Sequence, residues 1–224
     1  MSAPHPIPPA APDLSDALAS LDELPSELGS AEIVERRVQD LDASGRRAAD
    51  LRLLDSRLER VDLSGSVMPR SSITDVVVEG GSWANAELAD STLRRVEFRN
   101  VRLTGAVLSG SRIGDARFVD CRLDLAALRF TELERVRFER CRMPEADLYG
   151  AKLWSVVLAS CDLVGSSLAE ASFDRCEMRD CDLDGVGDPQ RLRGVGMPWP
   201  DVVRAAATLA AAAGIHVVED EEDA

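Results

Sequence analysis

Residues 146–185 read ADLYG AKLWS VVLAS CDLVG SSLAE ASFDR CEMRD CDLDG, and the third residue of each group of five is large and apolar. The same spacing continues without interruption over 26 positions, from Leu58 to Leu183. The residue two places earlier is short, as at Ala106 and Cys181. A period of five fits neither the 3.6-residue period of a helix nor the two-residue period of a strand.

A second period, four groups of five long, lies on top of the first. If each group of five forms one extended side and then turns a corner, four sides close a square coil and equivalent residues of successive coils stack. The sequence therefore predicts an all-β, parallel solenoid with ladders of identical side chains in its core. The clearest ladders are Cys121, Cys141, Cys161 and Cys181, and the rings of Phe98, Phe118 and Phe138.

Several groups of five resemble the A(D/N)LXX motif of pentapeptide repeat proteins. They are ADLYG (146–150), AKLWS (151–155), CDLVG (161–165), SSLAE (166–170) and CDLDG (181–185). The resemblance implies a right-handed quadrilateral parallel β-helix, the pentapeptide-repeat solenoid, with a C-terminal capping α-helix.

The chain divides into five segments. Leu41 and Leu51 are apolar but lie two residues out of phase with the five-residue period that starts at Leu58. Terminal repeats of a stack often deviate in this way. We expect a flexible Pro/Ala-rich N-terminal segment (1–30) with a possible short helix at 13–28, an irregular cap or first coil (31–52), the solenoid (53–187), a C-terminal loop and helix (188–218) and an acidic tail (219–224).

The alanine-rich run after Pro200 predicts a helix. Proline in the first turn and Gly214 just past the end are the usual boundaries. This helix either only caps the rod or, as the resemblance to some family members implies, also joins two rods into a homodimer. Its apolar residues are Val202, Val203, Ala206, Leu209, Ala210 and Ala213.

The net charge of −14 is unevenly distributed, because residues 94–142 carry twelve arginines and only seven acidic residues. Arg102, Arg122 and Arg142 occupy the same outward position in successive coils, so they are expected to stack. Such a column is either a dock for an acidic partner or phosphate, or a solvated face interleaved with carboxylates.

Four large apolar residues fall at positions expected to point outward: Leu125, Phe130, Tyr149 and Trp154. Aromatic residues make up only 4% of the chain, so exposed ones are candidates for a partner-binding patch. The alternative is that the N-terminal segment covers them.

No set of residues suggests catalysis, a cofactor or a metal site. His5 and His216 are far apart in the sequence, and a straight ladder of cysteines does not converge on a zinc ion. We interpret the five cysteines as reduced, buried small side chains. The Pro-rich N-terminus is not a signal peptide and no apolar run is long enough for a membrane span, which predicts a cytoplasmic protein.

Two functions fit these observations. The first is a non-catalytic interaction protein whose rigid rod is a binding scaffold for another protein. The alternative, implied by the resemblance, is a DNA mimic that binds and protects DNA gyrase, a type II topoisomerase, against quinolones or toxins. That role needs a continuous anionic face, and the net positive central coils disfavour it. The acidic residues that would form such a face are Asp62, Asp147, Asp162, Asp182 and Asp184.

Overall fold

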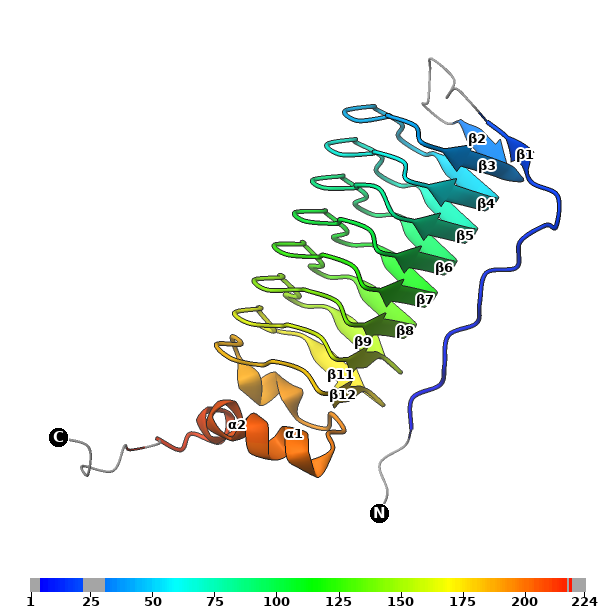
Figure 1. Cartoon of the computed structure of the whole chain (residues 1–224). Coiled ribbons are helices and arrows are strands. Elements are labelled where there is room, and N and C mark those ends of the chain that lie inside the picture. Colours follow the sequence, from blue (N-terminus) through cyan, green and yellow to red (C-terminus); the bar gives the residue numbers. More distant parts are fainter. Residues whose placement is uncertain (1–4, 22–30, 217, 219–224) are drawn as a thin grey trace.

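The computed structural model describes residues 5–21, 31–216 and 218. These residues form an elongated parallel β-solenoid of about eight coils, with short helices at its C-terminal end (Figure 1). The N-terminal segment runs alongside the stack of coils. The predicted fold class, a quadrilateral parallel β-solenoid, is confirmed.

One twelve-stranded parallel sheet wraps the rod. The five longest strands each cover two adjacent sides of a coil, and isolated β-bridges hold the other two sides. The strands are β1 (Ala19–Ser20), β2 (Glu32–Val34), β3 (Arg36–Gln39), β4 (Arg52–Glu59), β5 (Ser72–Glu79), β6 (Thr92–Arg99), β7 (Arg112–Val119), β8 (Glu132–Glu139), β9 (Lys152–Trp154), β10 (Val157–Ala159), β11 (Ser172–Asp174) and β12 (Glu177–Arg179).

The register of the sheet explains the longer period of the sequence. From Glu32 to Gly187 each strand pair and bridge joins residues 20 apart, as in the pair Phe98 and Phe118. Backbone N–H and C=O groups therefore find their partners in the coils above and below. Each coil depends on its neighbours for these bonds.

The corners of the coils are built from residues in the left-handed backbone region. Every fifth residue from Glu35 to Gly185 has a positive φ, between 43° and 71°. Glycine, Asn and Asp tolerate this conformation best, and they occupy many of the corners. The five-residue period of the sequence is thus the spacing between left-handed corners.

The core contains the two columns that the sequence predicts. Phe98, Phe118 and Phe138 are buried, and their rings stack with centroids 5.0 and 4.9 Å apart. Trp83 meets Phe98 edge-on at 5.3 Å. Because side chains of adjacent coils contact one another along the axis, the core is continuous through the rod.

All five cysteines are buried and free. In the ladder, each thiol donates to backbone carbonyls rather than to a neighbouring side chain; Cys141 Sγ, for example, lies 3.3 Å from the carbonyl oxygen of Phe118. Neighbouring thiols and burial raise the pKa of Cys141 and Cys181, and burial raises the pKa of Cys176. These three side chains are therefore neutral fillers of the core.

Ion pairs between successive coils line the corners. An arginine at position i+20 reaches back to an aspartate at position i, and its Nε and Nη2 donate to the two carboxylate oxygens. The pairs are Arg60 with Asp40, Arg70 with Asp50, Arg95 with Asp75, Arg135 with Asp115 and Arg140 with Asp120. In each case the arginine hydrogen bond holds the pKa of the aspartate below its ordinary value.

The N-terminal coil is more regular than the sequence suggests. Ile33 and Val38 pair in register with Leu53 and Leu58, so the 20-residue pairing register begins at Glu32. Leu51 occupies a column that short side chains fill in later coils, which is why it looks out of phase. The possible helix at 13–28 is not formed in its described part, because residues 13–21 contain no helical turn and include the strand β1; residues 22–28 lie outside the described residues.

The C-terminal end is helical but not one continuous helix. After the 3₁₀ turn η1 (Pro189–Leu192), helix α1 (Trp199–Arg204) and helix α2 (Ala206–Ala212) meet at Ala205, whose φ of −87° and ψ of 14° interrupt the helix. Thr208 donates to the carbonyl of Leu183 in the last regular coil. None of the helices in the described part of the chain is both long and apolar enough to cross a bilayer.

The ion-pair ladder predicts how stability depends on pH. The folded state holds these aspartates at pKa values below those of the unfolded chain, so unfolding takes up protons when the pH falls. We expect the free energy of unfolding in urea to decrease as the pH drops below about 4. Asp115→Asn should reduce this decrease, whereas Asp184→Asn, which removes a carboxylate with no ion pair among the described residues, should not. A stability that is unchanged between pH 5 and 3 would contradict the ladder's contribution.

Candidate interaction surface

Each candidate residue can be located by the side of the coil on which it lies. In one central coil, sides 1 to 4 are residues 111–115, 116–120, 121–125 and 126–130. Sides 1 and 3 are opposite each other, and sides 3 and 4 share the corner at Leu125. Residues 20 apart lie on the same side.

The arginine column predicted from the sequence forms on side 3. Arg102, Arg122 and Arg142 are bridged one above the other, and all three side chains are exposed. Arg142 lies 3.7 Å from Asp124 and 3.8 Å from Asp162. Arg102 and Arg122 make no ion pair within the described residues, so their charges face solvent one coil apart.

The charge of the side chains in this column changes sign along the rod. The sequence of stacked residues is Asp42, Asp62, Ser82, Arg102, Arg122, Arg142, Asp162 and Asp182. Stacked like charges repel one another, and exposed guanidinium groups without a carboxylate attract an anionic group of a partner.

Two bulky apolar residues occupy corners of the same coil. Leu125 has φ 58° and Phe130 has φ 56°, and each side chain is 59% exposed. Among the corners from Glu35 to Gly185 they are the only large apolar residues. The left-handed conformation disfavours such side chains, and exposure removes the gain from burial. These two positions are therefore unfavourable for the fold and stand out as candidates for binding.

The Phe130 ring is held in place by the next coil. It lies beside the backbone of Gly150, where an added Cβ would be 2.7 Å from the ring. It meets Tyr149 edge-on, with centroids 5.3 Å apart, and Arg129 lies 5.1 Å from the centre of the Tyr149 ring. The sequence analysis did not anticipate the contribution of Gly150. Its position 20 residues after Phe130, in the same corner column, would have revealed it.

Trp154 does not belong to this surface. It lies on side 1, opposite the arginine column, between Arg135 and Arg175 at 5.8 and 5.9 Å from its ring centre. The structure thus brings Phe130 and Tyr149 together and places Leu125 at the corner between them and the arginine side. The described part of the N-terminal segment leaves Phe130 exposed.

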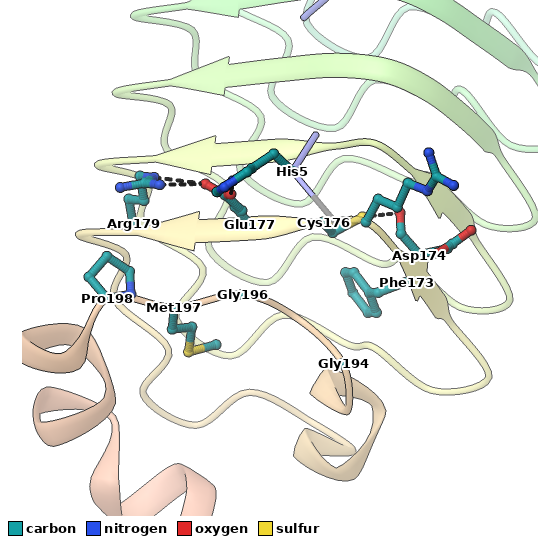
Figure 2. Close-up of a pocket in the computed structure, with 11 residues that line it drawn as sticks. His5, Phe173, Asp174, Cys176, Glu177, Arg179, Gly194, Gly196, Met197 and Pro198 are labelled. Carbon is teal, nitrogen blue, oxygen red and sulfur yellow. Dashed lines mark hydrogen bonds and ion pairs between the residues drawn. The ribbon is translucent and has the colours of Figure 1, made fainter. Parts of the chain in front are cut away.

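A pocket near the C-terminal end gathers residues of a different chemistry (Figure 2). His5 Nδ1 lies 3.1 Å from Glu177 Oε1, and Arg179 donates two hydrogen bonds to the same carboxylate. Burial alone would raise the pKa of Glu177, but the hydrogen bonds from Arg179 and His5 lower it. The Cys176 thiol donates instead to the carbonyl of Asp174.

This pocket is not organised as a nucleophile with its base. The raised pKa of Cys176 disfavours the thiolate, and His5 pairs with a carboxylate rather than with the thiol. In the portion of the chain that the structure describes, no three His, Cys, Asp or Glu side chains converge as a metal-binding group.

The apolar residues of the C-terminal helices divide into two sets. Val202, Leu209 and Ala210 are partly buried, whereas Val203, Ala206 and Ala213 are exposed. Trp199, which the sequence analysis did not single out, is 76% exposed beside Val203 at 58%. The helices cover the end of the rod and still present apolar side chains outward.

Comparisons with known proteins agree with this geometry. A family model described as the pentapeptide repeat region matches residues 91–160, and a model of pentapeptide repeats, in eight copies, matches residues 71–110 and 155–186. No curated protein sequence matches the chain.

Several solved structures are similar to the chain. Full-length QnrB1, a plasmid-mediated fluoroquinolone resistance protein, is 17% identical with a TM-score of 0.46, and the match covers 85% of this chain and 94% of QnrB1. HetL, involved in heterocyst differentiation regulation in the cyanobacterium Nostoc sp. strain PCC 7120, is 17% identical with a TM-score of 0.40, covering 79% and 93%. A pentapeptide repeat protein of the Arabidopsis thaliana thylakoid lumen is 24% identical with a TM-score of 0.37, covering 39% and 63%.

Three features belong to one fold. They are the unbroken five-residue period, the left-handed corners at the same spacing and the pairing of each coil with the next. Together with the family models that match between residues 71 and 186, they establish that this chain belongs to the pentapeptide repeat family.

Proposed function

We propose that this protein is a non-catalytic interaction scaffold that binds another protein through sides 3 and 4 of its central coils. Leu125, Phe130 and Tyr149, here called the Phe130 surface, provide the apolar contact. The exposed Arg102 and Arg122 on the adjacent side provide the contact to an acidic group. The observation that carries the proposal is the pair of exposed, bulky residues at left-handed corners.

The energetic argument starts from what these corners cost the fold. A bulky residue in the left-handed region costs of the order of 1–3 kcal/mol, and strain of this kind concentrates at functional sites. Asp, Asn or Gly at the same positions would avoid the cost, as they do at other corners. A binding role accounts for Leu125 and Phe130, whereas a purely structural role does not.

The composition and rigidity of the surface support binding. Tyrosine and arginine are enriched among the residues that contribute most to protein interfaces. The Phe130 ring already rests on Gly150 and Tyr149, so little conformational entropy is lost when a partner covers it. Arg122 and Leu125 belong to the same side of one coil, which joins the charged and apolar parts into one surface.

The alternative function, a DNA mimic that protects gyrase, has weaker support. It needs a continuous row of negative charge, but arginines of successive coils neutralise many of the corner aspartates. On side 3 the arginine column separates Asp62 from Asp162 and Asp182. The acidic residues of this column are therefore divided between the two ends of the rod.

We further propose a cytoplasmic location and a homodimer joined through the C-terminal helices. Five free, buried thiols suit a reducing compartment. The exposed Trp199 and Val203 suit an apolar contact between two copies.

Substitutions at the Phe130 surface test the scaffold function. The double variant Leu125→Asn/Phe130→Asn should unfold at a free energy within about 1 kcal/mol of the wild type, or higher, because asparagine tolerates the left-handed corner. A protein captured from a cell lysate by the wild type, then purified, should bind the variant at least about ten-fold more weakly by calorimetry, a loss of roughly 1.4 kcal/mol.

The matched control is Trp154→Ser on the opposite side, which should retain the affinity for the captured protein. Equal binding of the wild type and the Leu125/Phe130 variant would contradict the proposed site. A large loss of stability in that variant would mean that the two residues serve the fold.

A supercoiling assay tests the DNA-mimic alternative. Purified DNA gyrase is incubated with relaxed plasmid and a quinolone, with and without micromolar amounts of this protein. We expect neither inhibition nor protection, because the anionic face is interrupted. Protection that survives Leu125→Asn/Phe130→Asn but is lost on reversing the charges of Asp162 and Asp182 would favour the mimic instead.

Sedimentation tests the homodimer. The wild type should sediment as a dimer, and Trp199→Ser/Val203→Ser should sediment as a monomer with unchanged circular dichroism, because both side chains are exposed within one chain. Val202→Ser, on the partly buried side of α1, is the control for damage to the end of the rod. A wild type that is monomeric at high concentration would refute the dimer.

A further inference from the structure

Residues 5–16, here called the strap, cross the rod from its C-terminal end to its N-terminal end (Figure 1). His5 contacts Glu177 of β12 (Figure 2), and Ser15 donates to Asp55 of β4. The strap thus passes over the corner between sides 1 and 2 of the intervening coils. This corner is distinct from the Phe130 surface.

The strap is held by its backbone N–H groups. Ile7 N donates to Ser155 Oγ, Ala10 N donates to Asp115 Oδ1 at 3.2 Å, and Asp13 N donates to Asp75 Oδ1 at 3.1 Å. The acceptors are corner residues 40 positions apart, which means two coils apart. The donors are three residues apart.

The acceptors repeat one arrangement. In both Asp75 and Asp115 the same oxygen, Oδ1, accepts from the strap and from the Nε of an arginine in the next coil, Arg95 at 2.6 Å and Arg135 at 2.7 Å. The arginines occupy the corners of the alternate coils and orient the carboxylates. From Ser155 to Asp75 an acceptor for the strap therefore appears at every second coil, and beyond Asp75 the strap leaves this spacing, because Ser15 N donates to Asp55 in the adjacent coil at 2.7 Å.

The spacing of the donors along the strap matches the spacing of the acceptors along the rod. Three residues of an extended polyproline II chain and two coils of the solenoid advance by nearly the same distance. Three residues of polyproline II structure advance about 9.3 Å. Two coils of a parallel solenoid advance about 9.6 Å. An extended chain in this conformation can therefore place every third N–H group over every second coil without accumulating an error of more than a few tenths of an ångström per step.

The strap sequence has the same period of three. Pro6, Pro9 and Pro12 are its partly buried residues up to Asp13, and each directly precedes one of the three N–H donors. The proline ring fixes its own φ within the polyproline II range and pushes the preceding residue into extended structure. The pattern Pro-x-x, three times repeated, thus prepares both the conformation and the donor spacing before docking.

The strap is a loosely attached ligand of the rod. None of its residues is buried, and Ile7, its bulkiest residue besides the partly buried Leu14, is 42% exposed. Elements with few buried contacts open at low free energy, long before the fold as a whole. The corner beneath the strap is, by contrast, part of the rigid β-solenoid.

We propose that the corner row Asp75, Asp115 and Ser155 is a recognition site for an extended Pro-x-x repeat of a partner protein, which exchanges with the strap. The partner segment carries proline at every third position, each followed by a residue with a free N–H group. The chain's own strap is the resident occupant, and its covalent attachment gives it a high effective concentration.

The test uses the full chain and a fluorescent peptide with the sequence of residues 5–16. Ala10→Pro/Asp13→Pro removes two donated N–H groups from the strap but keeps it in polyproline II structure. Ala11→Pro is the matched control, because the Ala11 N–H group makes no hydrogen bond within the described residues. Anisotropy should show that the peptide binds the double variant at least about ten-fold more tightly than it binds the wild type or the Ala11→Pro chain.

The same substitutions in the peptide provide the second arm. A peptide carrying both prolines should lose binding to the double-variant chain, whereas a peptide with Ala11→Pro should bind like the original. Equal binding to all three chains, equal binding of all peptides, or no binding would overturn the proposal. A chain dimer that the peptide dissociates would also overturn it, by identifying the exchanging segment as the strap of a second copy.

Discussion

The spacing between left-handed corners is the constraint on which the rest of this structure depends. A residue with positive φ at every fifth position turns the chain through one corner, and four such turns return it above its starting point. All other regularities follow: the parallel register, the stacked columns and the continuous core. Because the backbone sets the period, the side chains at a corner are free to vary, provided that they tolerate the left-handed region.

That freedom separates structure from recognition in this molecule. Inward positions repeat from coil to coil, because each must fit the residue above and below. Corner and outward positions carry the differences, such as the aspartate and arginine pairs, the exposed arginines on side 3 and the bulky Leu125 and Phe130. The rod is thus a uniform support on which individual coils display different chemistry.

The core could be predicted from the sequence because its signal is local and repeated. The apolar column from Leu58 to Leu183 is found by counting in fives along the sequence. The ladders that include Cys121 and Phe98 are found by comparing each coil with the next. Residues 31–52 were predicted only as an irregular cap or first coil, because Leu51 is a large residue in a column that later holds short ones. The break at Ala205 carries no glycine or proline to reveal it.

The candidate surface was predictable only in part, for a related reason. Arg102 and Phe130 could be assigned outward positions, but which of them share a side depends on the order of sides around the coil. The path of the strap depends on a match between two unrelated periods, one in the prolines and one in the coils.

That path alters how the rod comes apart. In a linear array of repeats each unit contacts only its neighbours, so the ends fray independently and unfolding spreads inward. The N-terminal segment connects the last coils, at Glu177, with the first, where Ala19 and Ser20 pair with β3. As long as the segment stays docked, loosening either terminus therefore disturbs a contact of the other, and once it has detached the two ends fray separately.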